Sequence, residues 1–82
     1  MTARASLDYD ARKIRIAEVV GKNLRRMRED AGLSRPALAR MAGVSESLVV
    51  NAENGTQAPA LVALVAIAEV IDCSIDSFLE GL

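Results

Sequence analysis

The segment that decides the fold of this chain is RPALARMAGVSESLVVNAENG, residues 35–55. It predicts two short helices, at about 35–42 and 46–53, which meet at Gly43. A glycine can take the left-handed backbone conformation that ends one helix and turns the chain into the next. Two short helices joined by such a turn have the geometry of a helix-turn-helix.

Both short helices begin with residues suited to their first turns. Ser34 and Ser45 can each accept a hydrogen bond from the free amides at the start of a helix. Pro36 falls in a first turn, where a missing N–H is tolerated. In the second helix Val49 and Ala52 are expected to point inward, so the opposite side of that helix faces outward.

The flanking segments predict further helices and no strand. Apolar side chains recur three or four residues apart from Ile16 to Met27, which is one stripe of an amphipathic helix. We therefore expect an all-α, five-helix domain over residues 16–82. Its helices are predicted at about 16–31, 35–42, 46–53, 60–72 and 75–80.

Residues 1–15 form an N-terminal extension, and the pattern leaves its structure open. Leu7, Ala11 and Ile14 have helical spacing, so the extension can continue the first helix. It can also be a solvated tail, or it can fold back over the fourth helix. A DNA-binding arm is the remaining alternative, with basic residues at Arg4, Arg12, Lys13 and Arg15.

The charges are divided along the chain. All ten basic residues lie in the first forty positions, whereas residues 41–82 carry acids alone, and the net charge is −1. This asymmetry indicates a basic face for an anionic partner. The overall charge, however, is unusual for a DNA-binding protein. Proteins that bind DNA usually have a basic pI, and the pI here is about 5.3.

The composition excludes several classes of site. With no histidine and one cysteine, Cys73, the chain has no zinc site of Cys and His ligands, no Ser-His pair and no internal disulfide. We expect that the chain is not an enzyme and that it binds no metal and no cofactor. The longest apolar run, residues 58–68, is too short to span a bilayer. A cytoplasmic protein without a membrane segment is expected.

Several short motifs in register resemble the phage-repressor/Cro-like helix-turn-helix family, also called the xenobiotic response element family. The resemblance covers about residues 16–80. It implies a five-helix domain that usually dimerises and regulates transcription at a palindromic operator, which is double-stranded DNA. The motifs are residues 20–28 (VGKNLRRMR), 32–34 (GLS), 38–39 (LA), 43–45 (GVS), 53–55 (ENG), Pro59 and 64–68 (LVAIA).

The resemblance also implies roles for individual residues. Arg28 matches an arginine that pairs with the acid matching Glu53, which makes a structural ion pair. Arg35 replaces a glutamine that touches the DNA backbone, and an arginine can still hold a phosphate. The expected contacts to the DNA backbone are Ser34, Arg35, Arg40, Ser45 and Asn54.

The outward side of the helix at 46–53 is the expected reading surface, made of Glu46, Ser47, Leu48, Val50 and Asn51. Asn51 can bond the adenine edge with two hydrogen bonds, Ser47 can donate or accept, and Leu48 or Val50 can touch a thymine methyl. Glu46 can accept from the amino group of cytosine but repels nearby phosphates.

The helix at 60–72 is apolar nearly all round, which is typical of a helix buried on every side. We expect its inward face to be Leu61, Leu64, Val65, Ala68 and Ile71. An exposed apolar stripe indicates an association surface. The predicted dimer interface is Val62, Ala63, Ala66 and Val70.

These observations favour a sequence-specific transcriptional regulator, a repressor, that acts as a homodimer through the helix at 46–53. The alternative is a protein-interaction module that keeps the fold but has weakened or lost DNA binding, such as an anti-repressor or an antitoxin-like partner. Glu46 and the acidic second half favour this alternative, which would bind a protein partner.

Overall fold

The computed structural model of the chain describes residues 8–82, and these residues form helices and no strand. The predicted all-α fold is therefore confirmed. The fifth predicted helix, at about 75–80, is a short 3₁₀ helix, η1, so the described residues hold four α-helices where five helices were predicted. The elements are α1 (Tyr9–Asp30), α2 (Arg35–Ala42), α3 (Glu46–Glu53), α4 (Leu61–Ile71) and η1 (Ile75–Leu79).

The start of α1 differs from the prediction. The helix begins at Tyr9, well before the expected start at residue 16. Asp8 caps it by accepting a hydrogen bond from the Ala11 amide at 3.2 Å. Residues 9–15 thus continue the first helix and do not fold back over α4. Arg4 and Leu7, which were also named for the extension, fall on residues 1–7 and lie outside the described residues, whereas Arg12, Lys13 and Arg15 of the predicted DNA-binding arm lie on α1. The division at residue 16 stays a prediction.

The helix-turn-helix forms at the predicted residues, and a serine cap marks the start of each of its two helices. The Ser34 hydroxyl accepts from the Ala37 amide at 3.2 Å, and the Ser45 hydroxyl accepts from the Leu48 amide at 3.1 Å. Gly43 has a φ of 73°. This is the left-handed conformation that a glycine adopts without strain. The predicted bounds of both helices are confirmed.

One core unites all five elements. α1 packs against α3 and η1, and α2 packs against α3 and α4. Gly21 marks the closest approach of α1 to α3, since a Cβ there would collide with the Ala52 carbonyl oxygen. The fully buried large side chains are Val20, Leu24, Leu38, Val49, Ile67 and Phe78.

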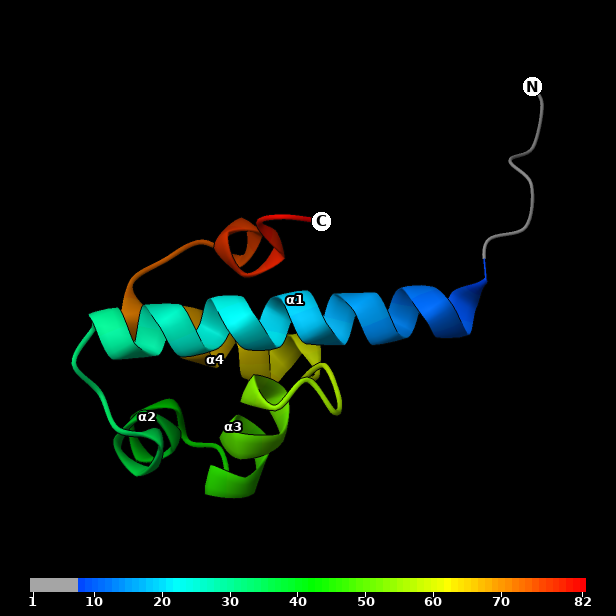
Figure 1. The fold of residues 1–82 in the computed structure, drawn as a ribbon. Helices are drawn as coiled ribbons and strands as arrows, with labels where there is room; N and C mark the ends of the chain where they lie inside the picture. The colour runs from blue at the N-terminus through cyan, green and yellow to red at the C-terminus, as the bar shows by residue number, and fades with distance from the viewer. Residues whose placement is uncertain (1–7) are drawn as a thin grey trace.

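A buried amide attaches the end of the chain to α1. Asn23 is 5% exposed, and its side-chain nitrogen donates to the carbonyl oxygens of Phe78 at 2.8 Å and Glu80 at 2.9 Å. These bonds satisfy a buried polar group that would otherwise be costly. They hold η1 on the side of α1 opposite to α2 and α3 (Figure 1).

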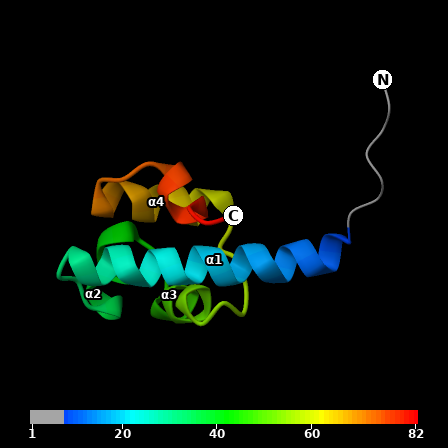
Figure 2. The ribbon, with the colours of Figure 1, turned by 45° about the horizontal axis from the view of Figure 1, so that its top comes forward.

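The helices α2 and α3 lie together on one side of the long α1 (Figure 1), and α4 lies behind α1 in Figure 1 and is seen beside it in Figure 2. The first turns of α1 project beyond this body, which gives extents of 46 × 21 × 20 Å. Residues 9–15 are all exposed, and the buried side of α1 begins at Ala17.

The predicted orientation of α4 is partly wrong. Leu61 and Val65 were expected to face inward but are 66% and 40% exposed. Ala63 was expected outside but is buried. The reason is that a helix apolar on every side has no polar face to reveal its orientation. The buried residues of α4 are Ala63, Leu64, Ile67 and Ala68.

Candidate nucleic-acid interface

The helix α3 is held by two inward side chains and presents the others outward. Val49 and Ala52 are at most 1% exposed, which confirms their predicted positions. The predicted reading residues Glu46, Ser47 and Asn51 are exposed. The outward surface of α3 therefore combines a carboxylate, a hydroxyl and a carboxamide.

Leu48 and Val50 are only half-buried, so each keeps some surface in solvent. Leu48 also packs against the core, and its amide is the one that Ser45 caps. Its availability to a partner is consequently limited to one edge of the side chain.

A hollow of about 280 Å³ opens beside the first turns of α3. One wall is α3 itself and the other is the loop that leads to α4. Gln57 in this loop is exposed, and no role was predicted for it. Its position in a polar loop directly after α3 was the available signal. The lining residues are Ser45, Ser47, Leu48, Asn51, Gln57, Ala58, Pro59 and Ala60.

The other predicted backbone contacts are also at the surface. Ser34, Arg40, Ser45 and Asn54 are all exposed. The hydroxyls of Ser34 and Ser45 accept hydrogen bonds as helix caps, yet each can still donate its own hydrogen to a phosphate oxygen.

A charged cluster under α3 joins three helices. Arg28 of α1 makes two hydrogen bonds to the carboxylate of Glu53, through its Nε and its Nη2, the latter at 2.9 Å. Its Nη1 donates to the Leu33 carbonyl oxygen at 2.8 Å. The predicted structural pair is present, and its side chains are 9% and 1% exposed.

The same carboxylate also binds Arg35, for which only a contact to the DNA backbone was predicted. Arg35 Nε lies 3.1 Å from Glu53 Oε1, and the Arg35 side chain is 37% exposed. A single carboxylate thus connects α1 and the first residue of α2 to the last residue of α3. The orientation of α2 relative to α3 is fixed by buried charge as well as by apolar packing.

The two arginines control the ionisation of Glu53. Burial by itself would raise the pKa of this carboxyl, but the hydrogen bonds from Arg28 and Arg35 outweigh burial and hold the pKa below its ordinary value of 4.5. The bond to Glu53 likewise raises the pKa of Arg28. Glu53 and Arg28 therefore stay charged near neutral pH.

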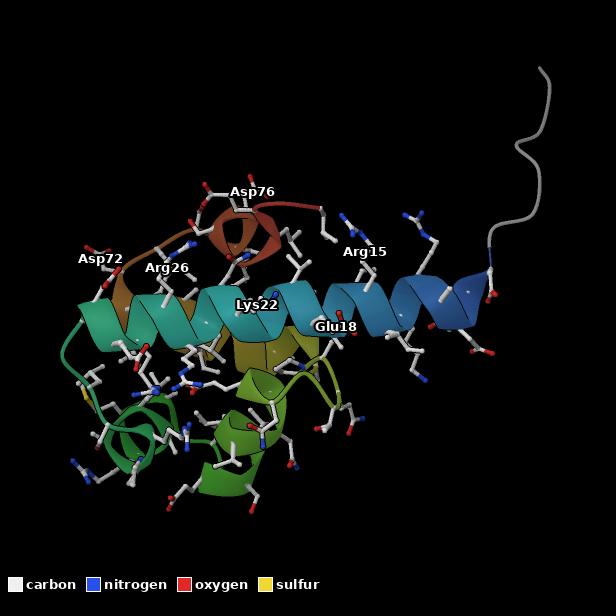
Figure 3. All side chains as sticks on the ribbon, viewed as in Figure 1. Arg15, Glu18, Lys22, Arg26, Asp72 and Asp76 are labelled. Carbon is white, nitrogen blue, oxygen red and sulfur yellow. The ribbon has the colours of Figure 1, made fainter. Side chains whose placement is uncertain are left out.

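Not every basic residue faces the same side as α3. Arg15 and Arg26 point toward η1, on the other side of α1 (Figure 3). Arg15 donates to the Gly81 carbonyl oxygen at 3.2 Å, and Arg26 lies 3.7 Å from Glu80. The placement of Arg15 gives no support to its predicted role in a DNA-binding arm.

The model of a helix-turn-helix family, HTH_3, matches residues 24–78 of the chain. The chain belongs to this family. A search of curated protein sequences gives no significant match.

Solved structures share the fold. The restriction-modification controller protein C.AhdI from Aeromonas hydrophila is 29% identical, with a TM-score of 0.72 over 76% of this chain and 94% of that one. The N-terminal DNA binding domain of SinR from Bacillus subtilis is 28% identical, with a TM-score of 0.74 over 78% and 94%. An HTH_3 family transcriptional regulator from Vibrio cholerae is 27% identical, with a TM-score of 0.76 over 82% and 38%.

The family and these neighbours are DNA-binding regulators, not enzymes, and this supports a DNA-binding regulator here. Within residues 8–82 no helix is long and apolar enough to cross a membrane. The same part of the chain contains no group of three or more potential metal ligands.

Proposed function

We propose that the chain is a sequence-specific transcriptional repressor that binds a palindromic operator as a homodimer, with α3 in the major groove. The observation that carries this proposal is the exposed outward side of α3, with Ser47 and Asn51 projecting from a helix anchored by Val49 and Ala52. Two neighbours support it: SinR is solved in complex with DNA, and C.AhdI is described as a controller protein.

The base contacts follow from the chemistry of α3. Asn51 can donate to and accept from an adenine edge, and Ser47 can bond either kind of base edge. The exposed edges of Leu48 and Val50 fit the methyl group of thymine. Glu46 fits the amino group of cytosine, and its repulsion of phosphates restricts the binding energy.

The backbone contacts come from the N-terminal ends of α2 and α3 and from the charges beside them. Arg35 is bound to Glu53 through Nε, so its two terminal nitrogens keep the donors that suit a phosphate. Arg40, Ser34, Ser45 and Asn54 complete the set. Because Glu53 restrains Arg35, little side-chain entropy is lost when a phosphate binds.

The homodimer is proposed to form through the outer side of α4. Val62 is 82% exposed, and Ala66 and Val70 are half-buried. Leu61 and Val65 join this surface, whereas Ala63 belongs to the core. An apolar helix face of this kind in water indicates an association surface.

The direct test is selection from a random duplex library at low salt, followed by sequencing of the retained DNA. We expect an enriched palindrome with half-site centres about 10 base pairs apart, the spacing that a helix-turn-helix dimer requires. Absence of any enrichment by folded protein would contradict the proposal.

A second candidate function, protein binding in place of DNA reading, has its own support. α3 carries Glu46 and no basic residue, and every charged residue after Arg40 is acidic. A neighbour with this fold, SinR, is also solved in a complex with the SinI protein. A purified protein that enriches no duplex but binds a protein partner through Leu48 and Val50 would favour this alternative.

A further inference from the structure

The exposed apolar side chains of this molecule are concentrated in one region. Eight large hydrophobic residues are exposed among the described residues, and only Met41 lies on the helix-turn-helix. The other seven lie on the first turns of α1, on the outer side of α4 and at the C-terminal end: Tyr9, Ile14, Leu61, Val62, Val65, Leu79 and Leu82.

The first turns of α1, residues 9–15, form what we call the projecting segment. None of its residues is buried, although two are large and apolar: Tyr9 is 75% and Ile14 is 60% exposed. Tyr9 and Ile14 are therefore apolar side chains on a mostly charged helix end, and no described residue buries them.

The projecting segment leaves the body close to the start of α4 and to the C-terminus (Figure 2). Tyr9 and Ile16 line a hollow of about 260 Å³ together with Ala58, which lies in the loop before α4. Ile16 and Arg12 line a second hollow, of about 160 Å³, with Leu82. The two hollows share Arg12 and Ile16, so they form a concave corner beside the projecting segment, bordered by the loop before α4 and by the C-terminus.

The projecting segment has a net charge of +2, since Asp10 accompanies three basic residues, whereas the only charged residue of α4 is the acidic Glu69. The projecting segment carries Arg12, Lys13 and Arg15, and among the described residues neither Arg12 nor Lys13 forms an ion pair. The chain from α4 onward carries acids alone: Glu69, Asp72, Asp76 and Glu80. A surface with both halves on one chain is self-complementary, as a twofold dimer requires.

We propose that the projecting segment packs against the outer side of α4 of a second copy, in a reciprocal twofold exchange. The occupant of the corner is thus another molecule of this chain. This inference rests on the homodimer of the proposed function. It adds the projecting segment to the proposed dimer interface. The arrangement leaves the outward side of α3 uncovered, since that surface lies on a different side of the body (Figure 1).

Sedimentation of the whole chain without DNA tests the inference. We expect a dimer whose Kd rises at least about tenfold in Ile14→Glu and in Val62→Glu, because each places a carboxylate in the apolar contact. Met41→Glu is the matched control, since Met41 is 57% exposed on α2, and its dimer should be unchanged. Circular dichroism checks that all three variants fold.

Cross-linking tests which surfaces meet. In a Cys73→Ser background, chains with Tyr9→Cys are mixed with chains that carry Val62→Cys and oxidised. We expect a disulfide-linked pair in higher yield than from Val62→Cys mixed with Met41→Cys. Equal yields from the two mixtures would overturn the exchange, as would a monomeric wild-type chain.

The outcome is separate from that of the proposed function, because sedimentation involves no DNA. A dimer that is insensitive to Ile14→Glu, combined with an enriched palindrome, would overturn the exchange and leave the repressor proposal standing. A dimer that is sensitive to both variants, without any enriched duplex, would overturn the repressor proposal alone.

Discussion

The side chains beneath α3 and those on the outer side of α4 differ in whether they find partners within the chain. Beneath α3 the charges of Arg28, Glu53 and Arg35 are paired within the chain, and no buried side-chain polar atom of the described residues lacks a hydrogen-bond partner. On the outer side of α4, Leu61 and Val62 are left in water. This difference underlies the proposal that α3 reads DNA from a single chain, whereas the α4 surface requires a second chain.

The largest expected effect comes from breaking the charged cluster. Glu53→Ala leaves Arg28 buried without its carboxylate, so we expect a loss of ~3–5 kcal/mol in the free energy of unfolding, measured with urea. Glu29→Ala is the control, because it removes an exposed pair with Arg25 at 3.7 Å. An exposed pair of this kind should cost less than ~1 kcal/mol. Equal losses in the two variants would contradict a stabilising role for the cluster.

The cluster also predicts how stability depends on pH. The pKa of Glu53 is lowered in the folded chain, so its contribution is fully present above its ordinary value of 4.5 and is lost as the pH falls through the folded pKa. We expect the stability of the wild type to fall more steeply below this ordinary value than that of Glu53→Gln. Parallel acid-unfolding curves would show that the carboxylate is not held by the arginines.

Changes to the outward side of α3 should affect DNA and leave folding unaltered. Asn51 is exposed, so Asn51→Ala should retain the stability of the wild type. Its preference at one base pair should fall by ~1–3 kcal/mol, measured by titration of the selected duplex and its single-base variants. Unchanged discrimination at every position would remove Asn51 from the reading surface.

Arg35→Ala should act on all sequences alike, because a phosphate contact carries no base identity. We expect weaker binding to every duplex and a salt dependence reduced by about one unit of slope. A loss confined to one base pair would show that Arg35 reads sequence and does not hold the backbone.

The smallest expected effect comes from Glu46. Glu46→Gln removes a carboxylate from the first turn of α3 and should tighten binding by a few-fold at low salt, with less effect at high salt. An exposed residue in this place should change stability little. Weaker binding to one base pair would instead indicate that the carboxylate accepts from cytosine.

Local interactions could be predicted from the sequence, and long-range ones could not. The bounds of α2 and α3 were predicted because Ser34, Gly43 and Ser45 act on their own neighbours. The start of α1 was placed at residue 16, and its continuation through the extension was left open on the helical spacing of Leu7, Ala11 and Ile14. Residues 9–15 are all exposed, so no buried face decided between these alternatives, although Asp8 was an available cap. The face of α4 could not be predicted from an apolar helix.

The spacing around Val49 and Ala52 predicted the outward side of α3, where Glu46, Ser47 and Asn51 are exposed, whereas Leu48 and Val50 are half-buried. The contacts of these residues with bases stay a prediction. The bond between Arg35 and Glu53 joins two different helices, and its presence depends on how α2 packs on α3. No local pattern encodes such a contact. No role was predicted for Gln57, although its place in the loop directly after α3 was an available signal, and in the folded chain it lines the same hollow as Asn51.

The most direct test of the separate roles proposed for α3 and α4 compares the affinity for a single half-site with the affinity for the full palindrome. Val62→Glu and the wild type would be titrated with both duplexes. We predict equal affinities for the half-site, because the reading surface is complete in one chain, and a selective loss of affinity for the palindrome in Val62→Glu. Equal weakening on both duplexes, with the variant folded, would contradict the division between the two surfaces.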